Sequence, residues 1–173
     1  MSTKILHISD LHFGPPFVPA VAEALLQTIP ALAPDVIVAS GDLTQRAKPY
    51  QFQAARQFVD QIPVPSLVVP GNHDVPLYRF WERFLSPYGA YSRHFSEELE
   101  PIYRDEELLV VGINTAHGWT FKDGRIRLRR LMEVAQVLEA APPDRLKVVV
   151  AHHHLIPPPW FGTQRVLTNA YEA

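Results

Sequence analysis

The stretch KILHISDLH, residues 4–12, shows the pattern on which the fold prediction rests. A short apolar run, KILHIS, ends in Asp10 and His12, two side chains that can bind a metal ion. Three further apolar runs end in the same way: residues 35–40 lead to Gly41-Asp42, residues 66–70 lead to Gly71-Asn72-His73-Asp74, and residues 147–151 lead to His152-His153-His154. With a fifth run at 107–114, these segments are typical of strands that are buried on both faces.

Segments with helical spacing alternate with these runs. They cover residues 19–32, 49–62, 76–85 and 125–140, so the order predicts an α/β layered fold. The apolar face of the second segment comprises Phe52, Ala55, Phe58, Val59 and Ile62, and that of the last comprises Leu128, Leu131, Met132, Ala135 and Leu138. The sequence has 173 residues and shows no repeat or linker, which predicts a single domain over residues 1–173.

Composition excludes several classes of function. A net charge of −2 does not favour a nucleic-acid backbone or an anionic membrane as a partner. The absence of cysteine excludes disulfides, thiolate ligands and a cysteine nucleophile, so any metal ion must use nitrogen and oxygen ligands. The start of the chain has no signal-like region and no apolar run reaches the roughly 18 residues of a membrane span, so we expect a cytoplasmic protein.

The polar strand exits are expected to meet in space, because the carboxyl ends of strands in an open α/β sheet share one edge. Asp10 and His12 are two residues apart, which in extended backbone would point both side chains the same way. Each pair alone also fits a helix cap or a polar turn. Together they offer carboxylate, imidazole and amide oxygen ligands, a set suited to manganese, iron or zinc.

Four blocks, ILHISDLHFG, SGDLTQ, PGNHD and VVVAHHHLIP, resemble in order the first four signature blocks of the calcineurin-like metallophosphoesterase family. The resemblance covers nearly the whole chain and is greatest to the bacterial branch related to class III cyclic-nucleotide phosphodiesterases. It implies a four-layered α/β/β/α sandwich that holds two metal ions. By resemblance, Asp10 and His12 hold the first ion, Asp42 bridges both, and Asn72 and His152 hold the second.

The same resemblance implies the roles of the next two residues and the reaction. His73 faces the scissile phosphate, and Asp74 orients its imidazole. A bridging carboxylate would keep two cations about 3.5 to 4 Å apart and activate a shared hydroxide for attack on a phosphodiester or phosphomonoester. The expected substrate is a small phosphorylated compound, for which a cyclic nucleotide is one option. A homodimer is one option for the assembly of the chain.

Three other functions stay open at this point. A nucleotide or lipid pyrophosphatase would use the same metal centre. A metal-poor binding module would keep the fold without the reaction. A nuclease is disfavoured by the mildly acidic charge balance, because a site that follows a duplex normally carries a basic stripe.

The sequence departs from the family in one respect, because the fifth block, Gly-His-x-His, is absent. After His154 there is only LIPPPWFGTQRVLTNAYEA, which predicts a proline-rich loop and a helix that begins at about Val166. We therefore expect the chain to be the N-terminal part of the family fold, without its C-terminal strands. Each metal ion would then lack one protein ligand, unless a partner subunit or water supplied it.

The remaining polar and aromatic residues near strand exits have weaker predictions. His153 is expected to support a metal ligand or to face the substrate, and His154 to support its own loop. Asn114, Thr115 and His117 leave the strand at 107–114 and would approach the substrate or satisfy their own loop. The aromatic residues that would stack on an organic group or cover a loop are Phe13, Trp119, Trp160 and Phe161.

Overall fold

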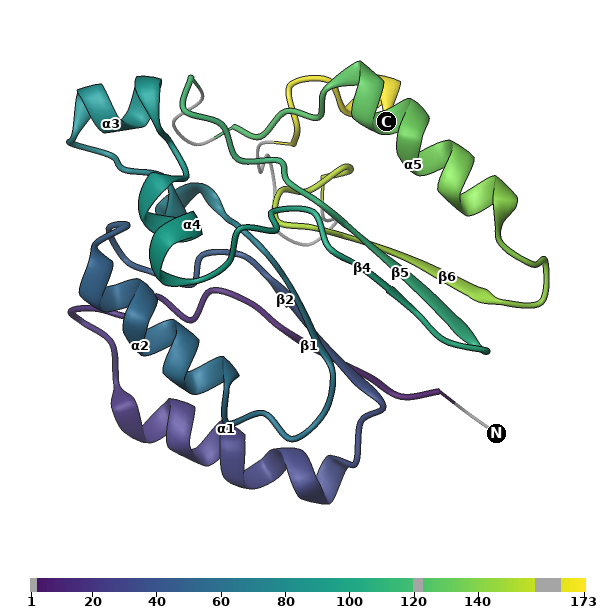
Figure 1. Cartoon of the computed structure of the whole chain (residues 1–173), viewed down its shortest axis with the longest axis horizontal. Helices are drawn as coiled ribbons and strands as arrows, with labels where there is room; N and C mark the ends of the chain where they lie inside the picture. Colours follow the sequence, from purple (N-terminus) through teal and green to yellow (C-terminus); the bar gives the residue numbers. More distant parts are fainter. Residues whose placement is uncertain (1–2, 120–122, 158–165) are drawn as a thin grey trace.

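The computed structural model describes residues 3–119, 123–157 and 166–173, and in these ranges two three-stranded sheets pack face to face (Figure 1). The first sheet is parallel, in the order β1-β2-β3. In the second, β4 runs antiparallel to β5, and β5 runs parallel to β6. The strands are β1 (Ile5–Ile8), β2 (Val36–Ser40), β3 (Ser66–Val69), β4 (Ile102–Arg104), β5 (Leu108–Ile113) and β6 (Leu146–Ala151).

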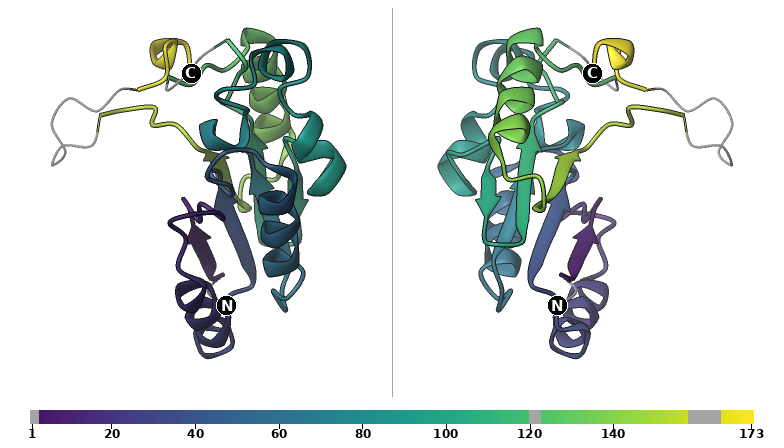
Figure 2. Two further views of the ribbon diagram at one scale, coloured as in Figure 1. Left: turned by 90° about the vertical axis from the view of Figure 1, so that its left-hand side faces the viewer. Right: turned by 90° about the vertical axis from the view of Figure 1, so that its right-hand side faces the viewer.

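Helices cover the outer faces of both sheets, as the views in Figure 2 show. α1 (Pro19–Leu32) and α2 (Pro49–Val59) lie on the first sheet, and α5 (Leu128–Ala140) lies on the second. Two short helices, α3 (Phe80–Leu85) and α4 (Gly89–His94), connect β3 to β4. Among the described residues, no helix combines the length and apolarity that crossing a bilayer requires.

Three apolar clusters fill the three interfaces between these layers. On β2, Ile37 and Ala39 face the cluster formed with α1 and α2, whereas Val36 and Val38 face the second sheet. On β5, Leu108 and Val110 pack between the sheets, and a third cluster joins the other face of β5 to α5 through Leu109, Val111, Ile113 and Val134. Each such side chain contributes about 1.5–3 kcal/mol when fully buried. The predicted α/β/β/α sandwich is therefore confirmed.

Within the described residues each sheet has two edge strands. β1 and β6 form the edges on one side of the sandwich and β3 and β4 those on the other, because β6 packs over β2 and β5 packs over β3. The expectation that every strand is buried on both faces is wrong for the edge strands β1, where His7 is exposed, and β6, where Leu146 and Val149 are exposed. For β6 the reason is that α5 packs against β5, which leaves the edge strand partly uncovered.

The sequence prediction missed or misplaced several elements. β4 and α4 were not predicted, and the helix expected over 76–85 begins only at Phe80. The predicted apolar face of α5 is wrong at Leu128, Met132 and Ala135, which are exposed. The helix expected from Val166 is also wrong, because the described part of that segment contains only a 3₁₀ turn at Ala170–Glu172.

Candidate metal centre

The exits of β1, β2, β3 and β6 meet at one edge of the sandwich, and they bring the predicted site residues together. The loop after β1 runs beside the loop after β2. The backbone N–H of Asp10 donates to the carbonyl of Gly41 at 3.1 Å, and that of His12 donates to the carbonyl of Asp42 at 2.9 Å. These backbone bonds hold the first carboxylate and the first imidazole next to Asp42.

Two glycines allow the loops after β2 and β3 to approach this closely. A Cβ atom on Gly71 would lie 2.2 Å from Oδ1 of Asp42 and 2.3 Å from its backbone nitrogen. A Cβ atom on Gly41, whose φ is +93°, would lie 2.7 Å from the nitrogen of Gly71. Any side chain at these positions would push Asp42 away from the residues that follow Gly71.

Asp10, His12 and Asp42 all have left-handed backbone conformations, with φ values of 57°, 49° and 52°. Non-glycine residues adopt this region uncommonly. The prediction that Asp10 and His12 meet is confirmed, but the extended backbone on which it was based is wrong. The two side chains do meet, with Nε2 of His12 lying 3.6 Å from Oδ1 of Asp10, but they do so through left-handed turns.

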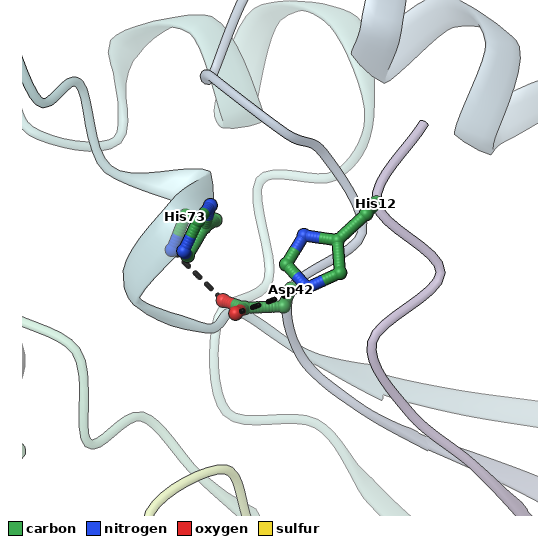
Figure 3. Close-up of side chains that lie close together, drawn as sticks. All are labelled: His12, Asp42 and His73. Atoms are coloured by element: carbon green, nitrogen blue, oxygen red, sulfur yellow. Dashed lines mark hydrogen bonds and ion pairs between the residues drawn. The ribbon is translucent and has the colours of Figure 1, made fainter. Parts of the chain in front are cut away.

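Asp42 lies at the centre of the cluster and is buried. Its Oδ2 atom lies 3.8 Å from Nε2 of His12, and its Oδ1 atom lies 3.4 Å from Nε2 of His152. Oδ1 also accepts a hydrogen bond from the backbone N–H of His73 at 2.8 Å. Figure 3 shows this carboxylate between His12 and His73. The two oxygens of Asp42 thus face two different groups of donors.

His152 joins the second sheet to the site. Its Nδ1 atom lies 2.7 Å from the carbonyl oxygen of Ser40, and its Nε2 atom lies 3.1 Å from Oδ1 of Asn72. A carbonyl oxygen can only accept a hydrogen bond, so Nδ1 carries a proton. Nε2 faces the side-chain oxygens of Asn72 and Asp42, and this is the ring nitrogen with which a metal ion shared by these side chains would bond.

His73 lies beside His12, with the two rings in a T-shaped arrangement and their centroids 4.7 Å apart. Its Nδ1 atom lies 3.0 Å from the carbonyl oxygen of Gln45 and 3.3 Å from a guanidinium nitrogen of Arg46. The bond to Gln45 requires a proton on Nδ1, which leaves Nε2 available. His12, Asp42 and His73 place one ligand atom each within 4.8 Å of one another.

The expectation that Asp74 orients the His73 ring is wrong. The buried carboxylate of Asp74 instead accepts backbone hydrogen bonds from Gly71 at 2.9 Å, Leu43 at 3.1 Å and Thr44 at 2.8 Å, and one from the Thr44 hydroxyl at 3.0 Å. Burial, followed by the nearby charge of Asp42, raises the pKa of Asp74 to about 6, against the lowering effect of these backbone hydrogen bonds. Asp74 ties the loop after β3 to the loop after β2.

The ring of His153 lies against that of His152 in a T-shaped arrangement, with the centroids 4.8 Å apart, whereas His117 contacts residues outside this cluster. Nδ1 of His153 lies 2.7 Å from the Thr115 hydroxyl, and Nε2 of His117 lies 2.5 Å from the carbonyl oxygen of Arg125. Burial lowers the pKa of His117. Asn114 accepts a bond from the backbone of its own loop at Ala116. This polar loop therefore satisfies its own backbone, which was one of the two alternatives from the sequence.

The loop aromatics have different environments. Phe13 is buried against Phe17 and Phe58, so it belongs to the core. Trp119 is exposed and lies beside Phe84, with ring centroids 4.6 Å apart. Trp160 and Phe161 lie outside the described residues.

Sequence reasoning missed the groups that fix the two imidazoles. They are the carbonyl oxygens of Ser40 and Gln45, which every residue type possesses and which carry no sequence signal. Gly41 and Gly71 did carry a signal, because a glycine directly before a polar strand exit indicates close backbone approach.

Comparison with known proteins accords with this geometry. The calcineurin-like phosphoesterase family profile matches residues 3–172. The chain belongs to this family. This calcineurin-like phosphoesterase is 29% identical over 85 residues to a probable cyclic nucleotide phosphodiesterase of Synechococcus. The match covers 44% of this chain and 33% of that protein. Over 41 residues it is 44% identical to a glycerophosphodiester phosphodiesterase of Enterobacter lignolyticus, which covers 24% of this chain and 15% of that protein.

Solved structures share the fold of this calcineurin-like phosphoesterase at low sequence identity. A purple acid phosphatase from yellow lupin aligns with a TM-score of 0.60 and 14% identity, over 89% of this chain and 31% of that one. A phosphopantetheinyl hydrolase of Mycobacterium tuberculosis aligns with a TM-score of 0.56 and 15% identity, over 89% and 69%. A Thermus thermophilus protein aligns with a TM-score of 0.57 and 18% identity, over 96% of this chain and 74% of that one.

Proposed function

We propose that this phosphoesterase hydrolyses a phosphodiester or phosphomonoester with the help of two metal ions. Asp10 and His12 would hold the first ion, Asn72 and His152 the second, and Asp42 would contact both. The observation that carries this proposal is the orientation of Asp42, whose oxygens face His12 on one side and His152 on the other.

The distances within the cluster support metal binding. Two ligands at about 2.1 Å from one tetrahedral ion lie about 3.4 Å apart. The separations of Asp10 from His12, of His12 from Asp42 and of Asp42 from His152 are 3.6, 3.8 and 3.4 Å. They are long for direct hydrogen bonds but suit ligands that share an ion. The donors are all oxygen and imidazole nitrogen, which suits manganese, iron or zinc.

Ions at these positions would supply positive charge that polarises the phosphoryl group and makes water more acidic. The protein's own part in the proton transfer falls to His73. Because Nδ1 donates to Gln45, Nε2 is the ring nitrogen left to face the substrate, and once Nε2 is also protonated it would donate a hydrogen bond to the phosphate or that proton to the leaving oxygen. A positioned acid of this kind contributes roughly 10²- to 10⁴-fold in rate.

The two named relatives favour a phosphodiester with a small organic substituent. One is called a probable cyclic nucleotide phosphodiesterase and the other a glycerophosphodiester phosphodiesterase. Because the matches span 33% and 15% of those proteins, their names indicate a class of substrate for this chain rather than one compound. The homodimer and the cytoplasmic location stay predictions.

The test is hydrolysis of bis(p-nitrophenyl) phosphate and p-nitrophenyl phosphate by the purified chain. The protein would be stripped of metal with EDTA and then given Mn²⁺, Fe²⁺ or Zn²⁺. We expect activity only after metal addition and none above background in Asp42→Asn. The matched control is Asp60→Asn, because Asp60 is an exposed carboxylate that pairs with Arg56 away from the site. Hydrolysis that survives both EDTA and Asp42→Asn would contradict the proposal.

A further inference from the structure

Thr115 carries a buried hydroxyl that has no part in the proposed reaction. It follows the end of β5 and is fully buried. A buried hydroxyl costs free energy unless it forms hydrogen bonds. Oγ1 of Thr115 lies 2.7 Å from Nδ1 of His153 and accepts a longer bond from the backbone N–H of His153 at 3.4 Å. Both contacts therefore lead to one residue, which follows the neighbouring strand β6.

The ring of His153 is held by residues outside its own loop. A hydroxyl has one proton and two lone pairs, so Thr115 can accept from the backbone of His153 and still donate to Nδ1. Gly124 packs so closely that a Cβ atom there would lie 2.3 Å from the same Nδ1 atom. The ring of His153 is thus confined between Thr115 and the backbone of Gly124.

His153 passes this constraint on to His152. The two rings lie edge to face, with an angle of 83° between their planes and centroids 4.8 Å apart. His152 is also anchored by the bond from its Nδ1 atom to the carbonyl oxygen of Ser40 at 2.7 Å. The χ2 torsion of histidine has broad minima, so one hydrogen bond leaves the ring plane free to tilt. The ring of His153 restricts that tilt.

Core packing alone does not explain a threonine at position 115. Valine has nearly the same shape and would fill the same space without a hydroxyl that needs a partner. In the described part of the chain, the Thr115 hydroxyl bonds only to His153. Because this contact engages Nδ1 of His153, that nitrogen is not available to a metal ion.

We propose that Thr115 is a positioning residue for the second metal ion. Its hydroxyl holds His153, and the ring of His153 sets the tilt at which Nε2 of His152 faces the site. This inference rests on the proposed function, because it takes His152 as a ligand of that ion. It adds the exit of β5 to those of β1, β2, β3 and β6.

Calorimetric titration of the EDTA-treated chain with Mn²⁺ tests this role without hydrolysis. Groups that orient a metal-binding histidine are worth roughly 10- to 100-fold in metal affinity, and Thr115 acts through one further residue, so Thr115→Val should weaken the second ion at least about fivefold. Affinity for the first ion should not change. Thr115→Ser, which keeps the hydroxyl, should restore the second affinity. The matched control is Thr28→Val, because the exposed Thr28 hydroxyl bonds its own helix at Ala24.

Two further measurements separate positioning from a structural role. The d–d absorption of the Co²⁺-loaded chain depends on ligand geometry, so it should change in Thr115→Val and return in Thr115→Ser. Urea unfolding in EDTA measures the stability of the metal-free fold. If Thr115→Val lowers this stability but binds both ions with native affinity, Thr115 only supports the fold and the proposal is overturned.

His153→Ala keeps the test decisive if Thr115→Val does not fold. It removes the ring that contacts His152, so it should weaken the second ion at least as much. Native affinity for that ion in His153→Ala would also overturn the proposal.

Hydrolysis of bis(p-nitrophenyl) phosphate and p-nitrophenyl phosphate separates this inference from the proposed function. If the native chain binds two ions but hydrolyses neither ester, and Thr115→Val weakens the second ion, the function fails and the positioning role stands. If hydrolysis requires metal but Thr115→Val and His153→Ala both bind the second ion as the native chain does, the function stands and the positioning role is overturned.

Discussion

The imidazole of His152 donates its Nδ1 proton to the carbonyl oxygen of Ser40, 2.7 Å away, and so joins the end of β6 in one sheet to the end of β2 in the other. This bond fixes the tautomer that leaves Nε2 facing Asn72 and Asp42. A residue 112 positions from Ser40 in the sequence therefore completes the site through a backbone atom.

Replacing His152 by alanine should weaken binding of the second ion at least about tenfold, because the ligand itself is lost. Measured metal content after dialysis against limiting Mn²⁺ should fall toward one ion per chain. His154→Ala is the matched control, since His154 is an exposed histidine of the same run. Equal metal content in the two variants would remove His152 from the ligand set.

Replacing His73 by alanine should keep metal binding but reduce kcat by roughly 10²- to 10⁴-fold, because the positioned acid is lost. Metal content and steady-state rates would be measured on the same sample. Because His73 lies close to His12 and Asp42, the metal content of the variant decides whether His73 is itself a ligand. A parallel loss of metal and activity would show that His73 is a ligand.

Asp74→Asn should destabilise the metal-free fold by about 2–4 kcal/mol, because the amide NH₂ would meet N–H donors that now bond the carboxylate. Urea unfolding in EDTA at pH 7 measures this loss. An effect within error would mean that the carboxylate does not tie the loops together.

The pH dependence of that difference has a defined sign. The raised pKa means that Asp74 takes up a proton at about pH 6 when folded, but only near 3.8 when unfolded. Its contribution to the free energy of unfolding therefore grows as pH falls from about 6 to about 4, by up to about 1.4 kcal/mol per unit. The stability gap between the native protein and Asp74→Asn should widen over that window. A gap that narrows would contradict the raised pKa.

Gly71→Ala should lower stability by about 1–3 kcal/mol and weaken metal binding, because its Cβ would overlap Oδ1 and the backbone of Asp42. Gly89→Ala is a suitable control. Its Cβ would meet only the side chain of Ser86, which can rotate, and it begins α4, where alanine favours the helix. Thermal unfolding with and without Mn²⁺ compares the two. Equal midpoints in both conditions would count against the close approach.

The helices and strands of the layers were largely predictable because their apolar periodicity is local. α1 has the predicted bounds, and the predicted face of α2 is confirmed by the burial of Phe52, Ala55 and Phe58. β4 was not predictable in this way. It has three residues and is held by pairing with β5, so its conformation depends on tertiary contacts rather than on its own sequence.

The meeting of the strand exits was also predictable, but its local geometry was not. Strand order places Asp10, Asp42, Asn72 and His152 at one edge, whereas the left-handed backbone of Asp10 and His12 leaves no clear trace in the sequence. The contact of Asp74 with Thr44 depends on how two loops pack, which residue spacing within one loop cannot reveal.

The left-handed backbone at Asp10, His12 and Asp42 creates a conflict between the stability of the fold and metal binding. This conformation is disfavoured for residues with a Cβ by about 1–2 kcal/mol each, and only glycine adopts it freely. A glycine at any of the three positions would relax the backbone while it removed a proposed ligand. Selection for heat resistance alone would therefore favour glycine at these three positions, whereas selection for bound ions would retain their side chains.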